Sequence, residues 1–517
     1  MKTLLKNCVI HGVDKDAILL SDNKIEKIGF YDDLNHYVDK YIDVDHGIVL
    51  PGFNDSHMHL LGVGNFVSSL QLQDCCTLEE VYDLVRTSCE NKKPGEWIVG
   101  RGWNQDNFDK VQFPTKEDLD KITLVNPICL TRCCGHVAVC NTKALELAKI
   151  TKETTVSGGD IEFETGLVKE MAIELIHHAF PPLTKEDLKT LIIKGMEECN
   201  QNGITSIQSD DFVSLTKDYH LPLEAFRELC NEGKCSCRVN EQCQFIVLDD
   251  LKMFIAENQL SNKGNEVFKL GPIKVVGDGS LGARTALMSS PYADANTSGM
   301  ANYTQEEFDM FVKLGEELGM GTIIHTIGDG CLDMVLNSFE KYCTPGNPHR
   351  SGIVHVQITR DDQLKRIEKL KLHCYIQSCF IDYDCRIVEQ RVGSKAKTSY
   401  AFKTLLETTT VSNGSDSPVE PLHCLKGIEC AITRSTIGCD NPYRKEEALT
   451  IEQAIDSYTK NGAYASFEEK IKGKLEAGML ADFVVLDQNP YTVKPSEIHN
   501  IQVKMTIFDG KVVYMKS

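Results

Sequence analysis

The sequence lacks any run of about 20 apolar residues, the length that a membrane-spanning helix requires. Its first residues are basic, but Asn7, His11 and Asp14 interrupt the apolar stretch that a secretory signal would need. These two shortages predict a soluble protein that is not exported.

Basic residues are also in short supply. The 55 Lys and Arg are outnumbered by 75 Asp and Glu, so the formal net charge of the 517 residues is -20. A surface of that sign repels phosphate backbones and anionic lipid headgroups. We therefore expect a small-molecule substrate, with no nucleic-acid partner and no membrane partner. The composition leaves open whether the chain forms a homo-oligomer.

Cysteine is plentiful, but the spacing of a metal-binding pair is missing. The chain carries 21 Cys and is far longer than a disulfide scaffold, which indicates a reducing compartment and predicts a cytoplasmic location. The group Cys230, Cys235, Cys237 and Cys243 contains no Cys-x2-Cys pair. We therefore expect buried thiols there rather than a structural zinc site.

Short apolar runs separated by turn residues occupy both ends of the chain, and this pattern is typical of antiparallel strands. They predict one small β-sandwich built from residues 1–50 and 465–517. Between the ends, strand-like segments alternate with helical stretches, which favours βα units and a parallel sheet. The segments lie at about 47–53, 204–209, 239–247, 272–277, 320–325, 352–357, 372–377 and 409–414.

Eight such strands predict an α/β fold, a (β/α)8 TIM-like barrel over residues 51–464. The gap between the first and second strands is too long for one helix. We therefore expect an inserted subdomain at about 65–185.

A His-x-His pair directly follows the first predicted strand. In extended backbone His57 and His59 project to the same side, so both imidazoles can reach one metal ion while Met58 points away. Most His-x-His pairs are incidental, so the pair needs further ligands before it indicates a zinc site.

Other candidate ligands recur in or after later predicted strands: Lys274, His325, His355 and Asp416. Each has an ordinary explanation alone, such as a core histidine, a solvated lysine or a helix N-cap before Pro418. Because the carboxyl ends of barrel strands meet at one mouth, their joint placement predicts a single site there.

Several stretches also resemble the amidohydrolase superfamily, in the branch of N-substituted formamide deformylases and AepA-like metal-dependent hydrolases, over essentially the whole chain. They are Pro-Gly-Phe-Asn-Asp-Ser-His-Met-His (51–59), Gly-Arg-Gly-Trp-Asn-Gln-Asp (100–106), Gly-His-Val-Ala-Val-Cys-Asn (135–141), Lys-Val-Val-Gly-Asp-Gly-Ser-Leu-Gly-Ala-Arg-Thr-Ala (274–286), His-Thr-Ile-Gly-Asp (325–329), Ile-Val-His-Val-Gln (353–357), Gly-Ser-Asp-Ser-Pro-Val (414–419) and Gly-Lys-Leu-Glu-Ala-Gly-Met-Leu-Ala-Asp-Phe (473–483).

The resemblance implies one or two Zn²⁺ or similar cations. It implies that His57 and His59 bind one metal ion and that His325 and His355 bind a second. A carboxylated Lys274 would bridge the two ions. It further implies that Asp416 touches a metal and moves protons. One departure stands after the seventh strand, where Gln377-Ser-Cys replaces the Gln-Pro of similar proteins, so substrate specificity does not carry over.

The chemistry is consistent with this set. An ammonium cannot ligate a metal, whereas a lysine carbamate offers two oxygens to the cations. A metal-activated water can then attack an amide, formamide or N-acyl bond of a small molecule, with Asp416 as the proton carrier. His136, Arg284 and Trp103 lie in or beside the matched stretches, and we name them as candidate substrate-binding residues.

Two other functions remain open. One is deamination of a cyclic amidine on the same barrel, which suits a site with one metal. The other is a non-catalytic regulatory relative, against which the retention of all six candidate ligands argues.

We expect the purified protein to contain one or two equivalents of zinc or a similar cation per chain, because four imidazoles are predicted at strand ends. Elemental analysis of the isolated protein measures this. An active protein whose metal content is near zero, and is not raised by added metal, would contradict the assignment.

Overall fold

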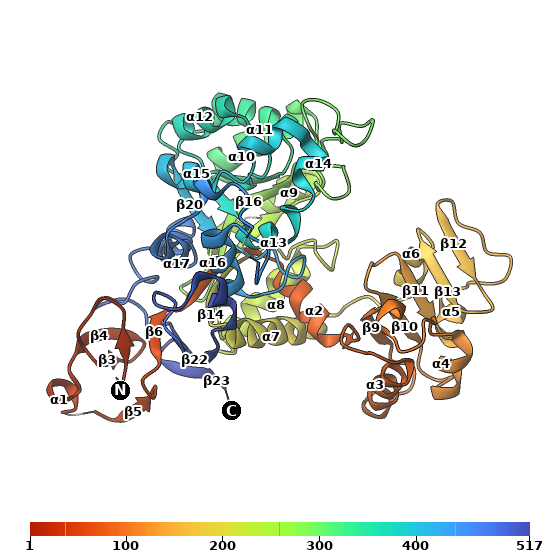
Figure 1. The fold of residues 1–517 in the computed structure, drawn as a ribbon, viewed down its shortest axis with the longest axis horizontal. Coiled ribbons are helices and arrows are strands. Elements are labelled where there is room, and N and C mark those ends of the chain that lie inside the picture. The colour runs from red at the N-terminus through yellow and green to blue at the C-terminus, as the bar shows by residue number, and fades with distance from the viewer. Residues whose placement is uncertain (37, 258, 440, 517) are drawn as a thin grey trace. The chain divides into compact units, whose positions relative to one another are not determined.

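The computed structural model describes residues 1–36, 38–257, 259–439 and 441–516. Contacts divide the chain into two compact units, residues 1–64 with 188–517 and residues 65–187. Figure 1 shows both as ribbons. Among the described residues, none of the helices has the length and apolar character needed to cross a bilayer.

The larger unit contains an eight-stranded parallel sheet in the order β20-β19-β18-β17-β16-β15-β14-β7. Its strands are β7 Phe53–Met58, β14 Ile204–Ser209, β15 Arg238–Gln244, β16 Phe268–Val276, β17 Thr322–Thr326, β18 Gly352–His355, β19 His373–Ile376 and β20 Thr410–Asn413. Residues of β7, β14, β18 and β19 are buried throughout, as expected of parallel strands covered on both faces. The predicted (β/α)8 TIM-like barrel is confirmed.

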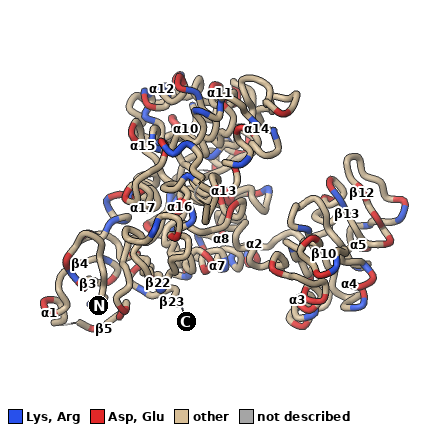
Figure 2. Tube along the Cα trace, viewed as in Figure 1, with Lys and Arg blue, Asp and Glu red and all other residues tan. Residues whose placement is uncertain are grey.

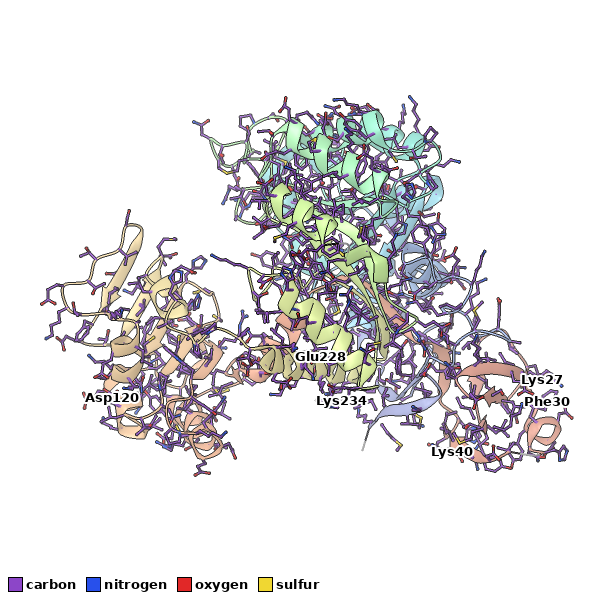
Figure 3. All side chains as sticks on the ribbon, turned by 180° about the vertical axis from the view of Figure 1, so that it is seen from behind. Lys27, Phe30, Lys40, Asp120, Glu228 and Lys234 are labelled. Atoms are coloured by element: carbon purple, nitrogen blue, oxygen red, sulfur yellow. The ribbon has the colours of Figure 1, made fainter. Side chains whose placement is uncertain are left out.

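Helices connect these strands and cover the outside of the barrel (Figure 1). They are α2 Leu60–Ser68, α7 Lys185–Gln201, α8 His220–Asn231, α9 Leu248–Ala256, α10 Gln305–Glu317, α11 Asp329–Tyr342, α12 Asp361–Leu370, α13 Ile381–Asp384, α14 Val388–Val392, α15 Phe402–Thr408, α16 Cys424–Thr433, α17 Ile451–Ser457 and α18 Lys460–Ala465. Ion pairs join neighbours: Lys189 of α7 lies 3.3 Å from Glu228 of α8 and 2.7 Å from Glu232. Figure 3 labels Glu228 on this layer.

The barrel closes between its first and last strands through the segment that follows β20. The Asp416 N–H donates to the His57 carbonyl at 2.8 Å, and the His59 N–H donates to the Ser417 carbonyl at 2.8 Å. The buried Asp55 carboxylate accepts the Ser415 N–H at 3.0 and 3.1 Å. The two ends of the sheet are thus joined at the carboxyl mouth.

Two smaller sheets, drawn from both ends of the chain, pack around one apolar core in which Leu5, Ile18, Val49, Phe483 and Ile507 are buried. One has the order β4-β3-β1-β5 and the other β2-β6-β21-β22-β23. The bounds are β1 Lys2–Lys6, β2 Val9–Ile10, β3 Ala17–Ser21, β4 Lys24–Gly29, β5 Lys40–Asp43, β6 Ile48–Pro51, β21 Phe483–Leu486, β22 Val503–Phe508 and β23 Lys511–Met515, with α1 Tyr31–Leu34 beside them.

The predicted first barrel strand, 47–53, was wrong. Ile48–Pro51 is β6, which pairs antiparallel with β21 in the sandwich. The chain crosses to the barrel at Gly52, where an added Cβ would lie 2.1 Å from Thr205 Oγ1. An apolar run reads the same in either sheet, so the sequence did not locate this crossing.

The unit 65–187 has its own six-stranded sheet, in the order β12-β13-β11-β10-β9-β8. Its elements are β8 Leu70–Gln71, α3 Leu78–Asn91, β9 Ile98–Trp103, α4 Lys116–Ile122, β10 Ile128–Arg132, β11 Val137–Cys140, α5 Thr142–Leu147, β12 Gly159–Glu162, β13 Leu167–Glu170 and α6 Ile173–His177. The chain leaves the larger unit at Gly64, where a Cβ would meet the Leu191 carbonyl oxygen at 2.0 Å. The point where the chain leaves the larger unit and the point where it re-enters therefore lie side by side within that unit.

Charge is distributed in both signs along the chain, as Figure 2 shows. A buried ion pair joins the barrel to the sandwich. Arg238, at the start of β15, donates to both oxygens of Asp482, at 2.6 and 3.1 Å, and to Asp509 at 2.9 Å. The side chains of Arg238 and Asp482 are only 2% and 5% exposed.

We expect Arg238→Met to lower the free energy of unfolding of the larger unit by about 3–5 kcal/mol, because it leaves a buried carboxylate without its partner. Urea titration followed by far-UV circular dichroism measures this. Fluorescence would not, because both tryptophans, Trp97 and Trp103, belong to the unit 65–187.

The matched control is Lys313→Met, which removes the exposed α10 pair with Glu317 at 3.8 Å. A pair of that kind contributes about 0–1 kcal/mol. If the free energy of unfolding fell equally in the two variants, the Arg238 contacts would not hold the sandwich to the barrel.

Candidate metal centre

The fold places all six predicted ligands in or just after barrel strands. His57 lies in β7 and His59 just beyond it, Lys274 in β16, His325 in β17, His355 at the end of β18, and Asp416 after β20. The strands are parallel, so these positions share the carboxyl mouth of the barrel.

Three of the six form a cluster. The nearest ligand atoms of His57, His59 and Asp416 all lie within 4.8 Å of one another. Asp416 Oδ1 is 3.1 Å from His59 Nε2 and 3.4 Å from His57 Nε2. It is the one such group of three among the described residues, and its side chains are buried or half-buried.

Partners on the other ring nitrogen hold both imidazoles in this orientation. Gln242 donates its Nε2 to the Ser56 carbonyl at 3.0 Å, which leaves its Oε1 to accept from His57 Nδ1 at 2.6 Å. His59 Nδ1 donates to the Asp210 carbonyl at 3.0 Å. With Nδ1 engaged in this way, each ring turns its Nε2 toward the centre of the cluster, as in metal-binding histidines.

The other two histidines lie against this cluster. The ring of His355 is 5.7 Å from that of His57 and 4.4 Å from that of His325, measured between centroids. The Nδ1 atoms of His325 and His355 are buried without a hydrogen-bond partner among the described residues. The nearest carboxylate to His325 Nδ1, Asp278 Oδ1, is 3.3 Å away, outside hydrogen-bond geometry.

Lys274 points into the barrel and is 1% exposed. Its ammonium lies 3.1 Å from Asp210 Oδ2. The Gln244 amide, turned so that its nitrogen faces this carboxylate, donates to both Asp210 oxygens at 2.8 Å. Lys274 is therefore not a solvated lysine, and Asp210 touches both Lys274, through its side chain, and His59, through its carbonyl.

The backbone is strained at the ligands. His355 has φ 77° and Asp416 φ 60°, in the left-handed region that non-glycine residues rarely adopt. Gly414 passes so close to β7 that a Cβ would lie 2.5 Å from His57 N. This closeness lets the chain after β20 bring Asp416 onto the two histidines.

Burial and the neighbouring charges set the protonation of the cluster. Burial lowers the pKa of His57 and His355 well below 6.5. Burial, the largest single effect, also disfavours the charged form of His59, but its hydrogen bond to Asp416 and the negative charges of Asp416 and Asp210 together outweigh burial and raise the pKa of His59 to about 9. Conversely, burial would raise the pKa of Asp416, but the three imidazoles lower it below its usual range.

The residues present fit a divalent cation. Imidazole nitrogens and carboxylate oxygens are the donors that zinc and similar metals prefer. The buried Nδ1 atoms of His325 and His355 lack partners, and such groups rarely stay unpaired in a protein without a reason. The geometry supports a divalent metal site and does not select zinc.

Each of the predicted substrate-binding residues has a partner within its own unit. Arg284, in the segment after β16, donates to Asp294 at 3.0 and 2.8 Å, which occupies its guanidinium. In the unit 65–187, His136 is exposed and lies 3.0 Å from Glu170. Trp103 of that unit is fully buried and donates its Nε1–H to the Leu130 carbonyl at 2.9 Å. Their roles toward a substrate remain predictions.

The sequence interpretation missed Gln242, Asp210 and Asp55, which hold or orient the predicted ligands. One signal was available, since β15 carries Asn-Glu-Gln in a strand that is buried along almost its whole length. Polar residues in such a run need partners inside the barrel.

Comparison with known proteins gives a consistent result. The family described as "Amidohydrolase family" matches residues 40–514. The putative amidohydrolase YtcJ of Bacillus subtilis is 29% identical, over 98% of this chain and 97% of that protein. The N-substituted formamide deformylase of Arthrobacter pascens is 24% identical, over 97% and 95%.

Solved structures agree with the sequence relatives. An uncharacterized metal-dependent hydrolase from Pyrococcus horikoshii has a TM-score of 0.77 and 30% identity, over 96% of this chain and 99% of that one. A similarly described protein from Pyrococcus furiosus has the same TM-score and 29% identity, over 95% and 100%.

We expect Gln242→Met to weaken binding of the metal by about 10–100-fold, because it frees the His57 ring to turn. Competition with a fluorescent chelator measures the affinity. Gln208→Met is the control, since Gln208 is buried in β14 but its Nε2 donates to the Gly462 carbonyl, at 3.0 Å, instead of to a ligand. Equal affinities in the two variants would mean that Gln242 does not orient His57.

Proposed function

We propose that this chain, which belongs to the amidohydrolase family, hydrolyses an amide, formamide or N-acyl bond of a small molecule. The cluster of His57, His59 and Asp416 at the mouth of the barrel carries the proposal. The relative that acts on N-substituted formamides supports a C–N bond as the target. We place the reaction in the cytoplasm, in keeping with 21 cysteines that are all unpaired.

The candidate ligands are enough for two divalent cations. His57 and His59 would hold one cation, His325 and His355 would hold a second, and a carboxylated Lys274 would supply oxygen ligands, with zinc as the proposed metal. Divalent cations of this kind polarise the scissile carbonyl and lower the pKa of water. Lys274 reacts with CO2 only as the free amine, so the carbamate requires its ammonium to give up the contact with Asp210.

Asp416 is the proposed proton carrier. As a carboxylate it can take a proton from the attacking water and deliver it to the leaving nitrogen. Its main-chain N–H is fixed to the His57 carbonyl at 2.8 Å, so the side chain is held beside the ligands through both transfers. Burial of the cluster limits the loss of that proton to solvent.

A second candidate is deamination of a cyclic amidine. The 3.1 Å contact of Lys274 with Asp210 favours it, because a lysine that stays an ammonium leaves a site for one metal. Released ammonia identifies this reaction, whereas the proposed hydrolysis yields an acid and an amine.

We expect the metal-loaded protein to hydrolyse members of a panel of N-formyl and N-acyl amines, and Asp416→Asn to lower turnover by about 10²–10⁴-fold, the range of general acid–base catalysis. Asn keeps the shape of Asp but not its basicity, so metal content stays near that of the wild type. Chromatography of the products and elemental analysis measure both.

Asp309→Asn on α10 is the matched control, because this carboxylate contacts Lys341 and Ser338 away from the ligands. If Asp416→Asn turned over normally, Asp416 would be structural and another base would be needed. If no member of the panel were hydrolysed and cyclic amidines, assayed beside it, released ammonia, the second candidate would replace the first.

A further inference from the structure

The proposed mechanism leaves one buried side chain at the mouth of the barrel without a role. Gln377 directly follows β19 and is 2% exposed. Neither its Oε1 nor its Nε2 has a hydrogen-bond partner among the described residues. Burying an amide without partners costs free energy, so a protein keeps one where something else binds it.

The strand order places Gln377 beside the ligands. β19 runs between β18, which ends in His355, and β20, which leads to Asp416. The Gln377 amide lies close enough to the His355 imidazole to raise its pKa slightly against the larger effect of burial, but the two groups do not meet in hydrogen-bond geometry. The aromatic ring of Phe380, three residues on, stacks on His355 with centroids 5.7 Å apart.

Other buried glutamines have partners that explain them. Gln242 orients His57, and Gln208 donates to the Gly462 carbonyl. Gln363 donates to the Asp329 carbonyl at 2.7 Å and to Asp333 at 2.8 Å. Gln208 and Gln357 also leave Oε1 unpaired, but each donates through Nε2. Among the buried glutamines that the structure describes, Gln377 is the one with neither amide atom paired.

The proposed substrate supplies a partner of the right chemistry. If cations bound by the histidines polarise the substrate carbonyl and Asp416 serves the leaving nitrogen, the N–H of the scissile bond would remain to be recognised. An amide oxygen such as Gln377 Oε1 accepts from an N–H donor.

We propose that Gln377 Oε1 accepts the scissile N–H, so that the enzyme selects secondary amides over N,N-disubstituted ones. This inference rests on the proposed hydrolysis. An N-methylated substrate brings no donor and leaves the buried oxygen unpaired, and sites of this kind reject such analogues strongly. Gln377 is then a residue that determines specificity.

The test compares N-butylformamide with N-butyl-N-methylformamide, or the corresponding pair for whichever amine the panel favours. We expect the wild type to prefer the secondary amide by at least about 10²-fold in kcat/KM. Gln377→Met, which keeps the length but has no strong acceptor, lowers kcat/KM for the secondary amide by about 10–100-fold and leaves the tertiary amide nearly unchanged. The ratio of kcat/KM for the secondary amide to kcat/KM for the tertiary amide therefore falls toward 1.

Two further variants separate recognition from structure. Gln377→Glu keeps an oxygen acceptor at this position and retains the preference, and it serves as the test if the Met variant does not fold. Gln208→Met removes a structural hydrogen bond and leaves the preference unchanged. Melting temperature and metal content are measured for each variant.

Each result has one meaning. A wild type that hydrolyses neither amide overturns the proposed function and the inference with it. A wild type that hydrolyses both equally well keeps the function and overturns the role of Gln377. Equal losses on both substrates in Gln377→Met, or a lower melting temperature with loss of metal, make Gln377 a structural residue and also overturn the proposal.

Discussion

The site depends on the closure of the barrel at one buried carboxylate. Asp55 is fully buried in β7 and accepts the N–H groups of Ser415, from the far end of the sheet, and of His57. Burial raises its pKa to about 7, although these N–H donors act in the opposite direction. Because Gly414 has no side chain, the two segments approach closely enough for this contact to form. The first and last parts of the barrel thereby contribute to one cluster.

Strand periodicity predicted most of the fold. Segment 204–209 coincides with β14, and the predicted strands from 320 to 414 overlap β17 to β20. The error at β6 arose because Ile48–Pro51 is apolar on both faces in a sandwich just as it would be in a barrel. Only pairing with β21, more than 400 residues later, decides between the two.

The candidate ligands could be predicted because chemistry and strand position coincide in them, whereas the residues that orient them could not. Gln242 of β15 reaches His57 of β7 across the intervening strand β14, and Asp210, just after β14, contacts His59. Contacts of this kind depend on strand register to within one residue. Arg284 shows the opposite case, because its matched stretch made it a substrate candidate while Asp294, ten residues on, occupies its guanidinium.

The adjacency of Gly64 and Leu191 has a consequence for the folding of the barrel. The whole unit 65–187 is a loop whose ends already touch. The entropy of closing a loop grows only with the logarithm of its length, by about 0.6 kcal/mol for each doubling. The barrel therefore tolerates insertions of very different length at this point, with little effect on the free energy of pairing β7 with β14.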